Sequence, residues 1–402
     1  ISKSGYVYRY TQKDLDLIKH NEFDLIIRGG SGILKGDVLS VSKLGIISFH
    51  HADNRINRGG PACFWEVYSC ESKTGFIIQK LNEVLDGGDV LLRGFFPTQK
   101  YYLLNHANML LRSNFYMKYL IKKISIDNKL PYEELNFPYS NKLYRFPDAK
   151  SSFLYIFKNL LYPIFMINFN HKILRKKHRW SVSYANKNWK ELEMRKSHKI
   201  LNPPNRFLAD PFLYSKNGNH YCFLENFDYI AKKADISVYQ INNGVDKFLG
   251  NALSEDFHLS FPYLFEVSGN LYMIPESHEI KQIRLYKCTE FPLKWKLEKV
   301  LIDNICAADT VVFYKDSLWW MLTNTDPLLS GDHQSDLSIF YSEDILTEDW
   351  KPHKLNPIYI DPHRSRNGGL FKEGDKFYRV CQKHGFCNYG ESSDIYQIKF
   401  IN

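Results

Sequence analysis

The second half of the chain repeats, and this repeat limits its fold more than any other feature. Four segments begin alike, at Ala209, Ser260, Ala308 and Arg366, at intervals of 51, 48 and 58 residues. Each is an apolar run that meets a turn, such as Lys216-Asn-Gly-Asn, and continues into an aromatic-rich strand, such as His220-Tyr-Cys-Phe-Leu. Such segments are typical of β-hairpins. Because their period suits four-stranded blades, we expect residues 176–402 to form an all-β propeller.

The predicted propeller has five blades. Four come from the repeats. The fifth combines Arg179 to Tyr184 with the terminal strand Ile395 to Phe400, so that both ends of the domain close the ring.

The repeat also places polar residues regularly. Fifteen residues after each blade's opening position stands a second polar residue, which gives the pairs Asp210 and Glu225, Phe261 and Glu276, Asp309 and Asn324, and Asn367 and Gln382. In an antiparallel hairpin the start of one strand and the end of the next share an edge. These residues, with Arg366, should therefore surround one mouth of the channel. They suit a sugar, whose hydroxyl groups need directed hydrogen bonds. Alternatively, they cap strand ends and tie blades together.

Residues 1–95 have a different pattern. A helix is predicted over Thr11 to His20, and three apolar runs follow it, Phe23 to Ile27, Gly45 to Phe49 and Gly75 to Leu81. Strands that alternate with a helix and loops indicate an α/β layer architecture.

Chemistry-bearing residues follow the second of these runs. His50 ends it, and Arg58-Gly59, Thr74-Gly75 and Leu85-Asp86-Gly87-Gly88-Asp89 come next. A histidine paired with a carboxylate can move protons, because the carboxylate fixes the imidazole tautomer.

This order resembles the folate-dependent formyltransferase family. The resemblance covers about residues 10 to 95. It implies a Rossmann-like fold, truncated at its N-terminus, with 10-formyltetrahydrofolate as the formyl donor. It assigns His50 as the proton shuttle and Asp86 as its partner. Ser48 stands where the family has asparagine and is a weakened oxyanion donor.

The same resemblance implies the other binding residues of the first domain. It places the folate ring near Arg28, Gly29, Gly30, Leu85 and Gly87, and it assigns Arg58 to the substrate. The family normally has further residues before this start, so Ile1 is not expected to be the natural first residue.

The second half resembles two groups. One is the five-bladed arabinanase-like glycosidases, which also open a blade with Asp-Pro. The other, matched by the Ala-Asp-Pro-Phe, Ile-Pro-Glu-Ser and Leu-Tyr-Lys-Cys strings, is the domain preceding the transferase in plant glucosamine inositolphosphorylceramide transferases. Glycosidases need two carboxylates flanking the bond. Phe261 opens the second blade without an acid, so this resemblance favours glycan binding or acceptor positioning over hydrolysis.

A basic connector is predicted over residues 96–175. From Pro97 to Trp180 the chain has 15 Lys and Arg against 4 Asp and Glu, so the remainder is about neutral and a nucleic-acid-binding domain is not expected. The apolar residues 152–169 stand before a basic cluster that ends at Arg179. The two together suit either a peripheral element on an anionic membrane or a helix packed between domains.

Composition and cysteine spacing bear on membrane insertion, metal sites and disulfides. No run of 18 uncharged apolar residues occurs, so a transmembrane helix is not expected. The seven cysteines are scattered and form no Cys-x-x-Cys, so neither a metal site nor a disulfide framework is expected. Single reduced thiols suit a cytoplasmic protein, peripheral to the inner membrane face if the connector touches lipid.

These observations together predict a formyltransferase. It would formylate the amine of an amino-sugar nucleotide or glycan in surface-polysaccharide synthesis, with the propeller positioning the acceptor. The alternative is a glycan-active propeller, associated with glycosidase or glycosyltransferase activity, beside a degenerate formyltransferase domain. The sequence does not indicate an oligomeric state.

Overall fold

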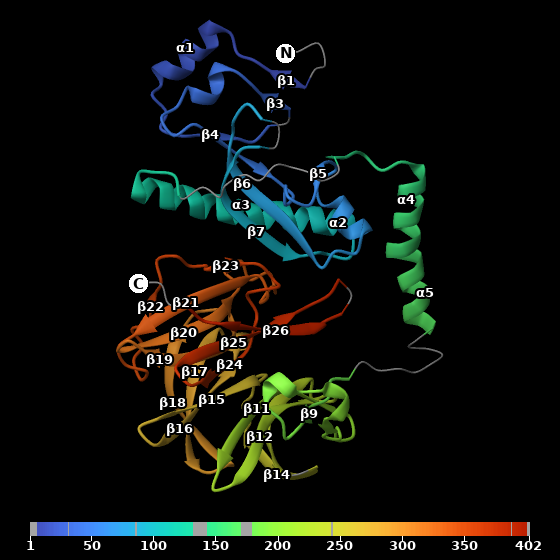
Figure 1. Ribbon diagram of the computed structural model, residues 1–402, viewed down its shortest axis with the longest axis vertical. Coiled ribbons are helices and arrows are strands. Elements are labelled where there is room, and N and C mark those ends of the chain that lie inside the picture. The colour runs from blue at the N-terminus through green and yellow to red at the C-terminus, as the bar shows by residue number, and fades with distance from the viewer. Residues whose placement is uncertain are drawn as a thin grey trace. The chain divides into compact units, whose positions relative to one another are not determined.

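The computed structural model describes residues 6–30, 32–84, 87–131, 143–169, 179–242, 244–386 and 388–399. The chain divides into two compact units. The first comprises Ile1–Phe169 with His384–Tyr389, and the second comprises Asn170–Lys383 with Gly390–Asn402. Figure 1 traces both along the chain.

The first unit is a mixed sheet with helices. Its elements are β1 (Val7–Tyr8), α1 (Gln12–His20), β2 (Ile26–Arg28), β3 (Ile33–Leu34), η1 (Asp37–Ser40), β4 (Ile46–His50), β5 (Arg58–Gly59), α2 (Phe64–Tyr68), β6 (Lys73–Lys80), β7 (Asp89–Pro97), α3 (Tyr102–Asp127), β8 (Leu143–Tyr144), α4 (Ala149–Ile156), η2 (Phe157–Leu161) and α5 (Tyr162–Asn168). The main sheet has the order β2-β4-β6-β7.

The predicted Rossmann-like core is wrong. In the main sheet β2 and β4 are parallel, but β4 with β6 and β6 with β7 are antiparallel. A doubly wound fold needs successive parallel strands joined by helical crossovers. Between β4 and β6 the chain forms only the two-residue β5 and the five-residue helix α2, and it returns in the opposite direction.

Local sequence explains the first unit's helices. Thr11 caps α1, since its side chain accepts from the Asp14 amide while the Asp14 carboxylate bonds back to Thr11. Leu15 of α1 is buried in a cluster with Val38, Val41 and Ile46, the first residue of β4. Helix α3 packs on the sheet, where its Tyr116 lies on Phe76 of β6 and Phe96 of β7 with ring centroids 5.7 and 5.8 Å away.

The described residues of the second unit form β-strands, loops and short 3₁₀ turns. Its strands are β9 (Ser183–Tyr184), β10 (His198–Lys199), β11 (Arg206–Lys216), β12 (Asn219–Asp228), β13 (Lys233–Asn242), β14 (Val245–Leu253), β15 (Ser260–Val267), β16 (Asn270–Glu276), β17 (Gln282–Glu290), β18 (Lys294–Asp303), β19 (Ala307–Lys315), β20 (Leu318–Thr325), β21 (Asp336–Ser342), β22 (Lys351–Pro352), β23 (Tyr359–Ile360), β24 (Asn367–Glu373), β25 (Lys376–Lys383) and β26 (Ser392–Gln397).

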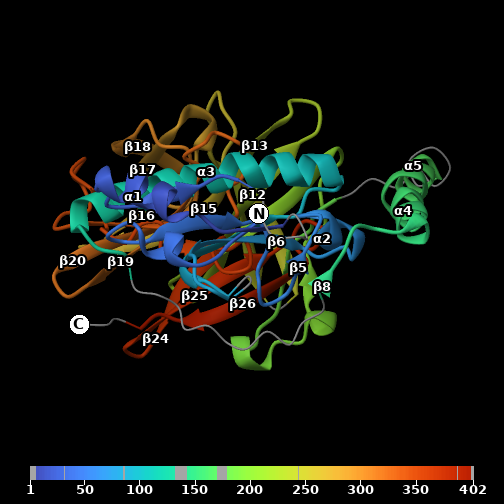
Figure 2. The ribbon, with the colours of Figure 1, turned by 90° about the horizontal axis from the view of Figure 1, so that it is seen from above.

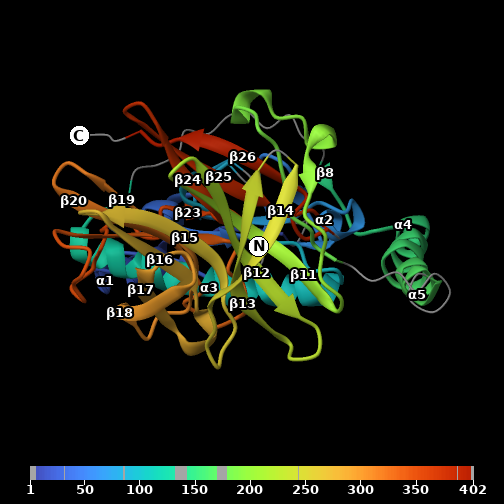
Figure 3. The same cartoon turned by 90° about the horizontal axis from the view of Figure 1, so that it is seen from below.

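These strands form antiparallel meanders that follow one another around the unit. The meanders are β11–β14, β15–β18, β19–β22 with β23 attached to β21, and β24–β26. Their first strands make contact in sequence, β11 with β15, β15 with β19, and β19 with β24. Figure 3 shows the four sheets succeeding one another from β11 round to β26, which is a propeller-like arrangement.

The fifth blade does not form as predicted. Ser183 and Tyr184 pair with His198 and Lys199 in a separate two-stranded sheet, and the terminal strand pairs with β25 in the fourth blade. The β9–β10 pair packs on the first blade through the buried residues Val182 and Ile200. The terminal strand therefore completes its own meander instead of joining the domain's first strand.

Apolar side chains fill the space between blades. The largest core cluster joins the second and third blades through residues such as Phe261, Ile274 and Val311, and Phe212 of the first blade and Leu370 of the fourth pack against it. This continuous core holds the four inner strands at fixed positions relative to one another.

Candidate functional site

One edge of the second unit gathers the polar residues of the repeat. Ala209 lies opposite Glu225, Ser260 opposite Glu276, and Ala308 opposite Asn324. In the fourth blade the amide of Gln382 donates to the carbonyl of Arg366 at 2.9 Å. The start of each inner strand thus faces the end of the next strand, as the hairpin spacing predicts.

A β-bulge stands at this position in every blade. Three of the bulges place a non-glycine residue in the left-handed region: Asp210 at φ 47°, Phe261 at φ 48° and Asp309 at φ 51°. Bulges redirect side chains, and backbone strain of this kind costs of order 1–3 kcal/mol per residue. The repeated bulge therefore sets the direction of Asp210 and Asp309 at the mouth.

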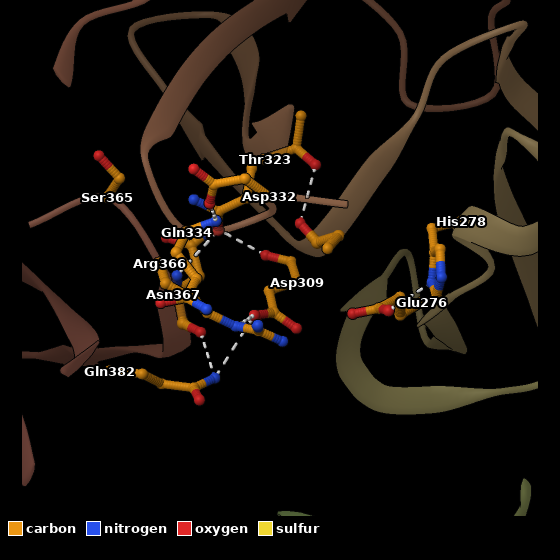
Figure 4. Close-up of polar contacts among 12 residues, drawn as sticks. Glu276, His278, Asp309, Thr323, Asp332, Gln334, Ser365, Arg366, Asn367 and Gln382 are labelled. Atoms are coloured by element: carbon orange, nitrogen blue, oxygen red, sulfur yellow. Dashed lines mark hydrogen bonds and ion pairs between the residues drawn. The ribbon is translucent and has the colours of Figure 1, made fainter. Parts of the chain in front are cut away.

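Asp309 and Arg366 form the centre of the cluster (Figure 4). The Arg366 Nε donates to Asp309 Oδ2 at 2.6 Å, and Gln382 Nε2 lies 3.4 Å from the same oxygen. The Asn367 side-chain Nδ2 donates to the Asp309 carbonyl at 2.7 Å, and the Asn367 backbone amide donates to Asn324 Oδ1 at 2.9 Å. The fourth blade is thus tied to the third through buried polar groups.

Histidines from neighbouring loops complete the site. The Glu276 carboxylate pairs with His278 Nδ1 at 2.7 Å, and the His278 ring packs on His333 with centroids 4.9 Å apart. The Nδ1 of His258 accepts from the Ala234 amide at 3.2 Å. Its Nε2 therefore carries the proton of the neutral ring and lies 3.6 Å from Glu225.

The acids are buried, and burial shifts their pKa values. Glu225, Glu276 and Asp309 are 7%, 8% and 0% exposed. Burial raises the pKa of Asp210 to about 6 against the opposing charge of Arg366. Burial and the neighbouring carboxylates raise the pKa of Glu225 well above its usual value. Burial also raises the pKa of Asp309 well above its usual value, although Arg366 opposes it.

Glu276 differs from these three acids. Burial alone would raise its pKa, but the hydrogen bond from His278 and the charge of Arg366 outweigh that effect and lower the pKa to about 2. Interaction with the Asp309 carboxyl also lowers the pKa of Glu276, and the same interaction raises the pKa of Asp309. Acids whose pKa values are pushed apart can respectively donate and accept a proton near neutral pH.

The sequence reasoning missed several residues of this cluster. Asn367 was noted only for its place in the repeat, and His258, His278 and His333 were not assigned. The one available signal was the spacing of His278, two residues after Glu276. His258 and His333 come from loops whose approach to the mouth depends on the packing of neighbouring blades.

The predicted residues of the first unit that the structure describes lie on or beside β2, β4, β5 and β7. Ser48 Oγ lies 3.3 Å from the carbonyl of Arg28, and His50 Nε2 lies 3.5 Å from the carbonyl of Asn57. Arg58 is in β5, which pairs with β8. Asp86 and Leu85 lie outside the described residues.

Arg28 of the predicted folate-binding set pairs with Ser48 of the predicted catalytic set, across β2 and β4. Arg28, Gly29 and Gly30 line a pocket of about 370 Å³ whose other walls come from β1, α1 and β4, and neither Ser48 nor His50 lines it. The Gly87 amide donates to the carbonyl of Val84 at 3.1 Å. The Thr-Gly motif is structural here, since Thr74 is buried and bonds to Thr98 and Asn105.

Comparisons with known proteins match the second half of the chain. A model of the family "Glucosamine inositolphosphorylceramide transferase 1, N-terminal" matches residues 192–402. The protein of that name from Arabidopsis thaliana is 39% identical over 204 residues, 50% of this chain and 26% of its own. The Oryza sativa subsp. japonica protein is 38% identical over 203 residues, 49% and 27% of the two chains. The chain thus spans about a quarter of these relatives.

The solved structures that match have lower sequence identity to this chain. A thermostable family-43 glycoside hydrolase has a TM-score of 0.38 and 13% identity, covering 48% of this chain and 72% of its own. An α-L-arabinanase from Cellvibrio cellulosa complexed with arabinohexaose has a TM-score of 0.38 and 11% identity, covering 48% and 74%.

These findings contradict the predicted formyltransferase activity. The relatives are named as transferases that concern glucosamine and inositolphosphorylceramide, not a formyl group. The predictions of a formyltransferase activity and of 10-formyltetrahydrofolate as its donor are therefore wrong. The resemblance of the second half to the domain preceding the plant transferase is confirmed. Since the family model matches more than half of its residues, the chain belongs to the glucosamine inositolphosphorylceramide transferase 1 N-terminal family.

Proposed function

We propose that the second unit is a glycan-recognition domain that positions the acceptor for glycosyl transfer. The observation that supports this most is the cluster of four acids around Arg366 at the mouth of the blades. Carboxylates and amides make the directed hydrogen bonds that sugar hydroxyl groups require. The relatives' printed name, which joins glucosamine to an inositol-bearing lipid, supports an acceptor rich in hydroxyl groups.

The contacts of the acidic side chains favour positioning of a sugar acceptor over hydrolysis of a glycosidic bond. A glycosidase needs one carboxyl to protonate the leaving oxygen and another to act on the opposite face of the sugar. Here Asp309 is bonded to Arg366, and Glu276 is bonded to His278. Phe261 occupies the second blade's bulge, where a third acid would otherwise stand. The ionised Glu276 is instead suited to accept a hydrogen bond from an acceptor hydroxyl.

A product assay separates the two activities. The full chain is incubated with fluorescently labelled oligosaccharides and inositol glycosides, and bound and released label are followed by chromatography. We expect retention of intact glycans. Release of a monosaccharide that disappears in Glu276→Gln would show hydrolysis and contradict the proposal. Failure to retain any of the glycans would also contradict it.

A further inference from the structure

Three ligand-bearing residues converge on the third blade. Cys306 precedes β19, Asp326 follows β20, and His333 stands in the loop that leads to β21. The Asp326 amide donates to the Cys306 carbonyl at 3.0 Å, which fixes the two chain segments side by side. One ligand atom from each of the thiol, carboxylate and imidazole lies within 4.8 Å of the other two.

Hydrogen bonds within the loop orient the carboxylate. Asp326 Oδ1 accepts from the Ser330 hydroxyl at 3.0 Å and Oδ2 from the Gly331 amide at 2.7 Å. Each oxygen keeps a further lone pair for a cation. Asp326 is only 2% exposed, so the fold sets the position of its side chain.

His333 has an imidazole nitrogen without a described partner. Its Nδ1 is buried and makes no hydrogen bond to any residue that the structure describes. A buried nitrogen of this kind is uncommon, because nearly all buried polar groups are hydrogen-bonded. An ion bound beside it would satisfy this atom.

We propose that Cys306, Asp326 and His333 bind a zinc ion through three protein ligands. A thiolate with an imidazole favours Zn²⁺ over Mg²⁺ or Ca²⁺, which prefer oxygen ligands. Zinc bound by three protein side chains keeps a fourth position for water or substrate. This site goes beyond the proposed glycan binding, and it departs from the sequence prediction that no metal site is present.

The location gives the ion a role. His333 packs on His278, and His278 pairs with Glu276 of the carboxylate cluster. An ion on His333 would fix the loop between β20 and β21 beside that cluster and would add positive charge near an excess of acids.

Metal titration of the full chain tests this site. The protein is stripped with a chelator and titrated with Zn²⁺ and, separately, with Co²⁺ as a spectroscopic probe. We expect one equivalent of either ion, with a thiolate-to-cobalt charge-transfer band and the visible bands of tetrahedral cobalt. Cys306→Ser should abolish the thiolate band, and His333→Gln should weaken binding by at least about 10- to 100-fold, the loss that second-shell changes already cause.

Cys288→Ser is the matched control, because this partly exposed thiol in β17 belongs to no such cluster among the described residues. It should bind like the unaltered chain. Absence of stoichiometric binding by the unaltered chain would overturn the proposal, as would a thiolate band that survives in Cys306→Ser. Because the readout is metal content and absorption, the result does not depend on glycan binding.

Discussion

At the scale of single residues, the mouth of the second unit holds more acids than the fold alone requires. Asp210, Glu225, Glu276 and Asp309 influence one another's pKa, and Arg366 is the guanidinium that acts on all four. Buried like charges destabilise a fold. Their concentration at three strained bulges is typical of a binding site whose residues are kept for function and not for stability.

Arg366 should matter more to stability than an ordinary surface arginine. Arg366→Gln leaves Asp309 buried without its cation, and breaking a buried ion pair costs about 3–5 kcal/mol in free energy of unfolding. Urea unfolding at pH 7 measures this loss. Arg206→Gln, which breaks a more exposed pair with Asp228, is the control and should cost about 1 kcal/mol or less. Equal losses in the two variants would contradict the central role given to Arg366.

Asp210 should make the chain less stable as the pH rises. Its pKa is about 6 in the folded chain against the ordinary 3.8, so the folded state binds the proton more tightly. The free energy of unfolding should therefore fall between about pH 4 and pH 6. Asp210→Asn cannot ionise, and we expect it to be more stable at pH 7 by about 3 kcal/mol.

Asp228→Asn is the control, because the Asp228 carboxyl changes the stability with pH in the opposite direction. Backbone amides of Ile230 and Ala231 lower the pKa of Asp228, so its carboxylate stabilises the fold above the ordinary carboxyl pKa and that contribution is lost as the pH falls. The variant should gain no stability at pH 7. Denaturant midpoints of the two variants and of the unaltered chain are measured from pH 4 to pH 7. A destabilised Asp210→Asn at pH 7 would refute the account of the Asp210 carboxyl.

The sequence could predict the acids of the mouth but not their surroundings. The 15-residue spacing follows from hairpin length alone, which is why Glu225, Glu276, Asn324 and Gln382 could be placed at one edge. The partners of these residues could not be predicted, because His258 and His333 reach the cluster through loops from other strands. The 20- and 7-residue gaps between Cys306, Asp326 and His333 likewise match no common metal motif.

At the scale of secondary-structure elements, local pattern predicted hairpins better than it predicted sheet topology. Turns such as Lys216-Asn-Gly-Asn fix a two-strand unit by their own chemistry. Which strand a terminal segment joins depends on long-range packing, so β26 was wrongly assigned to a fifth blade. For the same reason, apolar runs in the first unit gave strands without revealing that β6 and β7 run antiparallel.

The helical segments α4, η2 and α5 follow one another without a break (Figure 2), and several of their large apolar side chains are exposed. Phe153, Phe157, Leu161 and Phe165 are 65%, 47%, 53% and 64% exposed. Among the described helices, none is long and apolar enough to cross a membrane. The sequence continues into the basic stretch that ends at Arg179. Apolar surface beside basic residues suits adsorption to an anionic bilayer, which supports the peripheral contact proposed from the sequence.

Vesicle sedimentation tests this contact. The full chain should bind vesicles containing phosphatidylserine and be released by salt, because anionic lipid attracts basic residues over a short screened range. Replacing Arg175, Lys176 and Lys177 together by Glu should abolish binding. Replacing Lys13, Lys19 and Lys43 of the first unit by Glu changes the net charge equally and should leave binding unchanged. If the unaltered chain stays in the supernatant, or if both triple variants lose binding alike, the membrane contact is refuted.

At the scale of the whole molecule, the transferase family model matches residues 192–402, and residues 1–169, which make up most of the first unit, precede that match. Because the chain spans about a quarter of its curated relatives, their complete activity is a proposal for this chain. The described cluster supports the recognition part of that proposal, since it offers directed acceptors and donors and one ionised carboxylate at one edge of the blades.

The measurement that tests this account most directly is calorimetric titration of the full chain, at pH 7, with the glycan best retained in the product assay. Glu276→Gln should weaken binding by about 10- to 100-fold, since a hydrogen bond to a charged group contributes about 1.5–3 kcal/mol. Glu373→Gln, which alters an exposed carboxylate paired with Lys190, should bind as the unaltered chain does. Undiminished binding by Glu276→Gln, or an equal loss in Glu373→Gln, would contradict the assignment of the carboxylate cluster as the glycan site.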